Sequence, residues 1–324
     1  MPTLAAGEAL AECLNSLEAQ TYRNFETIVV DNSGARLVKE SARVRVIAND
    51  RNVGFGAAIN QGLAASSGDY LAALNDDAVA SAEWLAKLVA CAENDSKAGM
   101  FASEVLMAGS GRLDSAGMLI AADGTSRQRG HDEASAGYAK QTEALFPSGS
   151  AALYRRKMLE EIGAFEESFF LYCEDTDLGL RARWAGWGCR YVPGAQVKHR
   201  YSHSAGKASI MKAYYVERNR LFALVRNFPL GMCLCAPFAS ISRYFWHLMF
   251  MLEGRGKAAE FREGGNPALW LPFLVLRAHA TALIRLPRLL RERRAIAATR
   301  RLSAREFREL LARHTIPIRK VAAL

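Results

Sequence analysis

The feature that most constrains this chain is a regular alternation of helical and strand patterns between residues 8 and 105. Amphipathic helical spacing over residues 8–18 precedes an apolar, β-branched run at 25–30. The pattern then repeats as a strand at 44–48, a helix at 56–65, a strand at 70–74, a helix at 82–93 and a strand at 100–105. Such alternation predicts an α/β fold, in which a doubly wound, mostly parallel sheet carries crossover helices on both faces.

The length and the apolar pattern divide the chain into two regions. A chain of 324 residues exceeds one ordinary core, so we expect a catalytic domain at 1–228 and a helical, basic region at 229–324. The first domain is expected to comprise a nucleotide-binding half, 1–106, and an acceptor-binding half, 107–228. In the second half we expect a hairpin and loops at 109–146, a strand at 150–154, helices at 156–162 and 175–185, and a short strand at 190–193.

The net charge of +9 lies in the tail, because residues 276–324 contain 13 Lys or Arg and 3 Asp or Glu. The apolar stretches 230–252 and 269–286 are interrupted by arginine and histidine, which disfavours a membrane span and favours helices on an anionic membrane surface. The alternative is that these helices pack on the catalytic domain or on a second subunit, as in a homo-oligomer. Leucine and isoleucine interleaved with arginine suit lipid or protein better than a duplex, so no nucleic acid is expected.

The six cysteines are scattered, and none shows the spacing of a zinc or redox site. With no signal peptide at the start, we expect a reducing, cytoplasmic compartment. Cys233 and Cys235 are interpreted as two buried thiols.

Polar residues follow the first strands, where ligands bind in open α/β sheets. Asp31 ends the first strong strand and is expected either to accept hydrogen bonds from a base or ribose, or to close a turn. Gly54 and Gly56 lie between a strand and a helix, a position that suits phosphate. Ile59 stands where a third glycine would complete a dinucleotide motif, so a nucleotide-dependent oxidoreductase is the weaker interpretation.

Adjacent carboxylates at Asp76 and Asp77 follow the strand at 70–74. Two repelling carboxylates are best tolerated beside a hard cation, so Mg²⁺ or Mn²⁺ bridging a diphosphate is the expected occupant. The alternative role for these carboxylates is to cap the next helix, but Ser81 lies closer to that helix and is the better candidate for its N-cap.

A second acidic group, formed by Glu174, Asp175 and Asp177, stands at the start of a helix. One carboxylate suffices to cap a helix, whereas transfer to a hydroxyl group needs a base that takes its proton. The pair Glu174 and Asp175 is the candidate for that base. His199 follows a strand further on, and either completes a metal shell or is structural.

Six motifs in this order, VVDNSG, NxGFGAAINQG, LNDDA, PSGSA, GAFEESFFLYCEDTDLGLR and VKH, resemble glycosyltransferase family 2, particularly its rhamnosyltransferase-like bacterial members. The resemblance covers about residues 8–205. It implies a GT-A fold, inversion at the anomeric carbon and a divalent metal, Mg²⁺ or Mn²⁺, at a DxD-type motif. It further implies transfer of a sugar such as rhamnose from a dTDP- or UDP-sugar to a cell-surface glycan or lipid-linked acceptor, in cell-wall or polysaccharide biosynthesis on the cytoplasmic face of the inner membrane.

The resemblance also implies roles for the motif residues. Asp77 matches the final metal-binding acid, and His199 matches a histidine of the metal or diphosphate site. Asp175 matches the proposed base, with Glu174 beside it. The donor nucleotide is expected at Asp31, Asn32, Asn52, Gly54, Asn60, Asn75 and Asp76, where Asn75 replaces the first aspartate of the DxD-type motif. The acceptor is expected at Ser148, Gly149, Ser150 and Trp184.

The chain departs from the family at its start. Family members open with an apolar strand, whereas residues 1–6 here lead directly into the first helix, so we expect that strand to be missing. Because a lost central strand leaves backbone groups of its neighbours unpaired, a noncatalytic, membrane-associated scaffold is an alternative to an enzyme.

Overall fold

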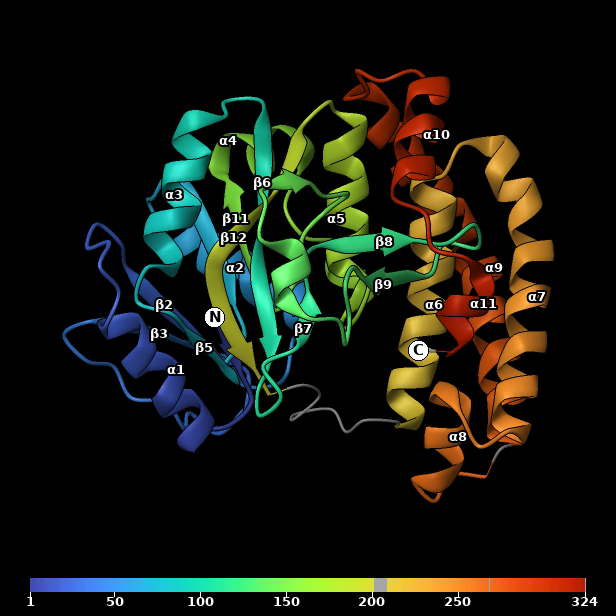
Figure 1. The fold of residues 1–324 in the computed structure, drawn as a ribbon, viewed down its shortest axis with the longest axis horizontal. Coiled ribbons are helices and arrows are strands. Elements are labelled where there is room, and N and C mark those ends of the chain that lie inside the picture. Colours follow the sequence, from blue (N-terminus) through green and yellow to red (C-terminus); the bar gives the residue numbers. More distant parts are fainter. Residues whose placement is uncertain (201–208, 268, 324) are drawn as a thin grey trace.

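A computed structural model describes residues 1–200, 209–267 and 269–323 (Figure 1). It confirms the α/β fold, with a central sheet covered by helices and a helical layer beside it. In spatial order the main strands are β10 (Thr142–Glu143), β12 (Gly188–His199), β6 (Ala98–Met107), β11 (Ala151–Arg155) and β4 (Tyr70–Leu74). β5 (Ala78–Ala80) pairs with β12, and β7 (Leu113–Ser115) pairs with β6. β4, β6 and β12 run in one direction, and β11 runs against both of its neighbours.

A second, parallel sheet consists of β1 (Pro2–Thr3), β2 (Thr27–Asp31) and β3 (Val44–Ala48). Here the structure differs from the expected absence of a first strand, because two residues of the opening segment are extended and pair with β2. The carbonyl groups of Met1 and Thr3 accept hydrogen bonds from the N–H groups of Val30 and Asn32, both at 2.8 Å. Even this short strand therefore satisfies backbone donors of β2.

Five helices of the sheet-bearing part follow the predicted pattern closely. They are α1 (Glu8–Glu18), α2 (Phe55–Ala65), α3 (Trp84–Asn94), α4 (Arg156–Ile162) and α5 (Glu174–Trp184). The expected cap of α3 is wrong, since the carbonyl of Ser81, not its hydroxyl, accepts from Trp84 N–H (3.0 Å) and the hydroxyl is buried without a partner. The strand expected at 190–193 is much longer, because β12 continues to His199.

Between β7 and β11 the chain forms the hairpin β8 (Met118–Ile120) and β9 (Ser126–Gln128), which extends from the sheet toward the helical layer (Figure 1). Two short 3-10 helices occur at Ser135–Tyr138 and Glu167–Phe169. The hairpin and loops expected for this stretch are therefore confirmed.

The helical layer contains α6 (Ile210–Asn227), α7 (Leu230–Leu252), α8 (Gly256–Glu263), α9 (Trp270–Ala298), α10 (Ala304–Arg313) and α11 (Ile318–Ala323). The sequence pattern did not predict α6. This helix packs along α9, so the helical layer begins before the boundary expected at residue 228. Among the described residues, no helix combines the length and the apolar character needed to cross a bilayer.

Part of the basic tail binds the sheet-bearing part of the chain instead of facing outward. Arg288 Nη2 lies 3.0 Å from Glu166 Oε1, and Arg301 Nη2 lies 2.7 Å from Glu161 Oε1. The ring of Phe307 in α10 stacks on the buried ring of Trp184 at the end of α5, with centroids 3.8 Å apart. The tail is thus an integral part of the core.

Asp177 is the buried centre of the contact between α5 and α6. Its carboxylate accepts from Arg181 Nε (2.8 Å), Arg226 Nε (2.7 Å) and Asn227 Nδ2 (2.8 Å). Burial alone would raise the pKa of Asp177, but the two arginines outweigh it and lower the pKa. The third acid of the EDTD segment therefore serves the fold, and the charge of Asp177 balances two buried cations.

Replacement of this carboxylate is expected to be severe. Asp177→Asn removes the charge that Arg181 and Arg226 share. Arg226 keeps Glu166 and Glu292, but Arg181 is left with backbone carbonyls alone, so we expect a loss of about 3–5 kcal/mol of stability, measured by urea unfolding. Asp50→Asn is the matched control, because Asp50 and its partner Arg36 are largely exposed and 3.5 Å apart; it should change stability by less than about 0.5 kcal/mol. Equal effects of the two substitutions would contradict the proposed role of Asp177.

Candidate active site

The first group of site residues lies where β4 and β12 end at the same edge of the sheet. Asp77 follows β4, and its Oδ1 lies 3.3 Å from Nε2 of His199, the last residue of β12. Both side chains are buried. Asn75 Nδ2 is also 3.3 Å from His199 Nε2. Asp76 faces elsewhere and accepts from Thr3 Oγ1 at 2.6 Å. The structure thus brings Asn75, Asp77 and His199 together, with Asp76 as a neighbour.

Asp114 is a member of this group that the sequence analysis missed. Its Oδ2 lies 3.0 Å from His199 Nδ1, and its Oδ1 lies 3.3 Å from His131 Nδ1. Burial alone would lower the pKa of His199, but the hydrogen bonds with Asp114 and Asp77 outweigh it and raise the pKa to about 9. Asp114 orients the ring so that Nε2 faces Asp77.

This arrangement fits part of a divalent metal site. A carboxylate oxygen of Asp77 lies 3.3 Å from an imidazole nitrogen of His199, and a second carboxylate holds the far nitrogen of the ring, as is usual for histidine ligands. Within residues 1–200, 209–267 and 269–323 there is no cluster of three or more His, Cys, Asp or Glu suited to a metal. The protein side therefore offers two ligands, and the remaining ligands would have to come from a substrate or water.

The second group is the acidic pair at the start of α5. Asp175 Oδ2 accepts from Gly149 N–H (3.0 Å), and Asp175 Oδ1 accepts from Thr176 N–H (2.6 Å). Glu174 is buried, and its Oε2 has no hydrogen-bond partner. Burial and the nearby charge of Asp175 raise the pKa of Glu174 to about 8, while burial raises the pKa of Asp175. Asp175 is the better hydrogen-bonded carboxylate of the pair.

A backbone segment in unusual conformations leads into this pair. Phe170, Tyr172 and Cys173 all have positive φ angles of 63°, 69° and 64°. Asn219 in α6 holds the segment, because its Nδ2 donates to the carbonyl groups of Phe169 (2.9 Å), Leu171 (2.8 Å) and Tyr172 (2.7 Å). Such strain persists only where surrounding contacts fix it, so α6 helps to position the acidic pair.

The glycine-containing motif contacts the same segment from the other side. Phe55 N–H at the start of α2 donates to the Phe170 carbonyl (2.8 Å), and a Cβ at Gly54 would lie 2.5 Å from that oxygen. Asn52 Oδ1 accepts from Gly54 N–H (2.9 Å), and Asn60 Nδ2 donates to the Phe165 carbonyl (2.8 Å). In this structure these residues support the segment before the acidic pair, and Asn60 contacts Phe165 and Glu167.

The strand-end residues of β2 form a closed turn. Asp31 accepts from the N–H groups of Ser33 (2.9 Å) and Val38 (3.0 Å). Burial alone would raise the pKa of Asp31, but the hydrogen bonds from Ser33 and Val38 outweigh it, so the pKa is lowered. Asn32 Oδ1 accepts from Asn49 Nδ2 at 2.7 Å. The turn that the sequence predicts at Asp31 is therefore present. The other role, hydrogen bonding to a base or ribose at this strand end, stays a prediction.

Three of the residues expected to bind the acceptor lie in one loop, and the fourth, Trp184, lies elsewhere. Gly149 contacts Asp175, Ser148 and Ser150 lie in the same loop with their hydroxyls 3.0 Å apart, and the Ser150 carbonyl accepts from Asn75 N–H (2.9 Å). Trp184 is 1% exposed and donates from Nε1 to the Asn227 carbonyl at 2.7 Å. It lies between Phe307 and the guanidinium of Arg300, so the expectation that Trp184 contacts the acceptor is wrong.

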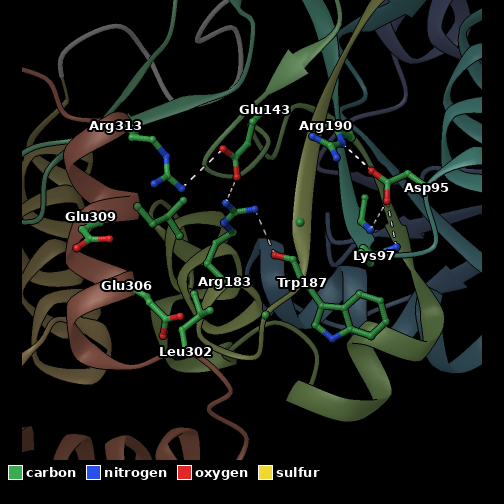
Figure 2. A pocket seen from close by; sticks show the side chains of 14 residues that line it. Asp95, Lys97, Glu143, Arg183, Trp187, Arg190, Leu302, Glu306, Glu309 and Arg313 are labelled. Carbon is green, nitrogen blue, oxygen red and sulfur yellow. Dashed lines mark hydrogen bonds and ion pairs between the residues drawn. The ribbon is translucent and has the colours of Figure 1, made fainter.

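Figure 2 shows a cavity of about 340 Å³ at the opposite edge of the sheet, where β6 and β12 begin. Its charged residues pair with each other, as in Arg190 with Asp95 (2.6 Å) and Arg183 with Glu143. Ligands of open α/β sheets bind beyond the carboxyl ends of the strands. The edge of Asp77, His199 and Asp175 is therefore the candidate site.

Known proteins resemble this chain in fold and in sequence. The solved structure of GalNAc-T7 with UDP, GalNAc and Mn²⁺ matches with a TM-score of 0.55 at 14% identity, over 69% of this chain and 46% of that chain. This likeness, across less than half the length of GalNAc-T7, shows the GT-A fold of nucleotide-sugar transferases. The model of the family described as glycosyl transferase family 2 matches residues 1–163. The chain belongs to this family and is a glycosyltransferase.

Curated relatives agree with this assignment. The N-acetylglucosaminyl-diphospho-decaprenol L-rhamnosyltransferase of Mycobacterium tuberculosis is 30% identical in an alignment 250 residues long, which covers 66% of this chain and 79% of the relative. The rhamnosyltransferase WbbL of Escherichia coli K12 is 33% identical over 90 residues, 25% of this chain and 33% of the relative. The family resemblance and the enzyme class are confirmed, and the scaffold and oxidoreductase alternatives are set aside.

The close approach at Gly54 gives a test of the positioned segment. Gly54 has φ +93°, and a side chain there would collide with the Phe170 carbonyl. We expect Gly54→Ala to lower stability by more than about 1 kcal/mol and to reduce sugar transfer, because the segment before Glu174 must shift. Gly231→Ala is the control, because a side chain at this position of α7 meets open space, and it should retain parental stability and sugar transfer. Full activity and stability in Gly54→Ala would show that the segment is not held as described.

Proposed function

We propose that this protein is an inverting glycosyltransferase that moves a sugar from a nucleotide diphosphate donor to an acceptor hydroxyl. The observation that carries the proposal is the position of Asp175 beside the loop of Ser148, Gly149 and Ser150, where it accepts from Gly149 N–H at 3.0 Å. In a single in-line displacement, a base removes the proton of the acceptor hydroxyl, and the acceptor oxygen attacks the anomeric carbon on the face opposite the leaving diphosphate. This attack inverts the configuration of that carbon. The sequence motifs and the family membership support the same reaction.

Asp175 is the base in this proposal. Burial raises the pKa of Asp175, which brings the carboxylate closer to the value that favours proton uptake at neutral pH. The N–H groups of Gly149 and Thr176 hold the two oxygens in place. Glu174, with a pKa of about 8, stays protonated at neutral pH. It therefore adds no second negative charge that would repel the acceptor oxygen when the acceptor hydroxyl loses its proton.

Asp77 and His199 would hold Mg²⁺ or Mn²⁺, and Asp114 fixes the ring of His199 for that role. A divalent ion bound there supplies positive charge that stabilises the leaving diphosphate. The donor nucleotide, a dTDP- or UDP-sugar, would extend from this pair toward Asp31 and Asn32 at the end of β2. The rest of the donor-binding region would be formed by the residues expected from the sequence, which are Asn52, Gly54, Asn60, Asn75 and Asp76.

The relatives suggest the substrate class. A rhamnosyltransferase that acts on a diphospho-decaprenol acceptor matches two thirds of this chain. We therefore propose rhamnose as the transferred sugar and a glycan or lipid-linked acceptor, in polysaccharide biosynthesis. Ser148, Gly149 and Ser150 would border that acceptor, whereas the buried Trp184 is excluded from this role.

Two substitutions separate the roles of base and metal ligand. Asp175→Asn removes the proton acceptor, so we expect transfer to fall at least about 10²-fold while binding of UDP or dTDP with Mn²⁺ is unchanged. Asp77→Asn should instead weaken Mn²⁺-dependent nucleotide binding, measured by isothermal titration. Asp69→Asn, an exposed carboxylate outside the site, is the control. Wild-type transfer by Asp175→Asn, with the donor that the parent protein uses, would contradict the proposal.

We further propose that the enzyme lies peripherally on the cytoplasmic face of the inner membrane. Seven apolar residues of α7 are spaced by three or four positions along one helix face and are 50–77% exposed: Leu230, Leu234, Phe238, Ile241, Phe245, Leu248 and Leu252. In α9, exposed Phe273, Leu276, Leu283 and Ile284 precede exposed Arg291 and Arg294. An apolar face followed by arginine is typical of helices on anionic lipid.

Vesicle binding tests this surface. We expect the protein to sediment with phosphatidylglycerol vesicles and less with neutral phosphatidylcholine vesicles. The variant Leu234→Glu, Phe238→Glu, Phe245→Glu should remain in the supernatant, because charged groups resist burial in the interface. Leu37→Glu, at an exposed leucine far from α7, should bind as the parent does. Loss of dimerisation in the triple variant, with vesicle binding retained, would assign the face to a second copy of the chain and contradict the proposal.

A further inference from the structure

The hydroxyl group of Thr176 contacts the carboxylate that is proposed as the base. Thr176 follows Asp175 in the first turn of α5, and its side chain is fully buried. Its Oγ1 donates to Asp175 Oδ1 at 3.3 Å, and its N–H donates to the same oxygen at 2.6 Å. A carboxylate offers about four lone-pair sites on its two oxygens. Thr176 alone therefore occupies the share that belongs to Oδ1.

A second hydroxyl group fixes the direction of this contact. Ser126 Oγ in β9 lies 2.9 Å from Thr176 Oγ1. An ionised carboxylate only accepts hydrogen bonds, so Thr176 donates its single hydroxyl proton to Asp175 and accepts the proton of Ser126. The result is a chain of hydroxyl donors that runs from Ser126 through Thr176 to Asp175. Hydrogen bonds in such a chain polarise and strengthen one another.

The hairpin that carries Ser126 is anchored at its turn. Asp123, between β8 and β9, is fully buried, and its Oδ2 accepts from Arg243 Nε of α7 at 2.6 Å. The carbonyl of Asp123 accepts from Arg220 of α6. Ser126 itself pairs with Ile120 of β8. The helical layer, which the hairpin reaches in Figure 1, thus holds the Ser126 hydroxyl against α5.

The other oxygen of the base faces the loop expected to border the acceptor. Asp175 Oδ2 accepts from Gly149 N–H at 3.0 Å, and a Cβ at Gly149 would lie 3.5 Å from this oxygen. One hydrogen bond leaves Oδ2 with a lone-pair site for a further donor. A hydroxyl group beside this loop can therefore donate to Oδ2.

Titratable side chains that respond to the charge of Asp175 include Glu174, Cys173 and Tyr154. Burial, followed by the charge of Asp175, raises the pKa of each, so all three are uncharged at neutral pH. The positive charges of Arg220 and Arg127 act on Cys173 in the opposite direction. For Asp175 itself, burial raises the pKa, and the hydrogen bonds from Gly149 and Thr176 lower it part of the way. Loss of a donor to this carboxylate should therefore raise its pKa further.

We propose that the hydroxyl groups of Ser126 and Thr176 position the base by saturating Oδ1 of Asp175, so that Oδ2 takes the acceptor proton. This inference rests on the proposed transfer at Asp175, and it adds the reacting atom and two positioning residues. In the step, the O–H bond of the acceptor breaks and an O–H bond forms at Oδ2. The electron pair left on the acceptor oxygen forms the bond to the anomeric carbon while the bond to the leaving diphosphate breaks.

The first test is an NMR titration of the full chain, labelled isotopically at the side-chain carboxyl carbon of aspartate. The signal of Asp175 is the one that Asp175→Asn removes. Thr176→Val removes the hydroxyl donor, so we expect the titration midpoint of Asp175 to rise by about 0.5–1 pH unit. Thr176→Ser keeps the hydroxyl and should titrate as the parent does. The matched control is Thr125→Val, because the buried hydroxyl of Thr125 in the same hairpin has no hydrogen-bond partner in the structure.

Two further measurements report the reacting oxygen and the reaction. A proton on Oδ2 weakens the hydrogen bond from Gly149, so the amide signal of Gly149 should shift more than that of Thr176 during the titration. For transfer with the donor and acceptor that the parent protein uses, the acid limb of kcat/KM reports the ionisation of the base. In Thr176→Val this limb should move to higher pH with the plateau largely retained, whereas a mere defect in folding would lower the plateau and leave the limb in place.

An unchanged midpoint in a folded Thr176→Val variant, or no restoration by Thr176→Ser, would overturn the inference. A larger shift of the Thr176 amide than of the Gly149 amide would do the same. If Thr176→Val does not fold, Ser126→Ala decides, because loss of the outer donor should still raise the midpoint, and no rise would count against the chain. Failure of the Asp175 assignment is distinct, since it appears as transfer by Asp175→Asn with the midpoint shift in Thr176→Val intact.

Discussion

The buried carboxylate of Asp177 is the interaction on which the catalytic geometry depends. It joins Arg181 of its own helix to Arg226 of α6, and Arg226 also contacts Glu166 (3.1 Å) and Glu292. One network of ion pairs therefore connects α5 and the segment before it to α6 and α9. Desolvated ions are favourable only when all partners are present, so this network resists small displacements of α5. Because Glu174 and Asp175 occupy the first turn of α5, their position follows from that contact.

The helical layer consequently takes part in building the active site. Asn219 of α6 holds three carbonyl groups of the strained segment before Glu174, and α10 closes the far end of α5 through Phe307. Gly54 and Phe55 thus support the segment before Glu174 from one side, and α6 supports it from the other. A region that looks like an appendage from its composition supplies part of the rigidity that a positioned base needs.

Much of this arrangement could be predicted from the sequence, because local patterns specify local structure. The alternation of helical and strand spacing of apolar residues predicted most strands of the sheet and the helices that cover it. The acidic pairs were found because adjacent carboxylates at the ends of strands and helices repel each other and are costly without a function. Asp114 escaped detection, since a single aspartate in a short strand has no local signal and approaches His199 only through the pairing of β7, β6 and β12. The partners of Trp184 are likewise distant in sequence, so an aromatic ring near a motif was mistaken for a ligand contact. Helix α6 was missed because many of its polar residues, such as Asn219 and Arg220, are buried in tertiary contacts.

The stacking of Trp184 on Phe307 has a consequence for the order in which the protein folds. During synthesis, α5 and its acidic pair emerge from the ribosome long before the residue that covers the end of this helix. Until then the indole and the apolar surface around it lack their native partner, and contacts of such large sequence separation form slowly. The sheet-bearing part of the chain therefore reaches its final packing around Trp184 only after α10 has formed.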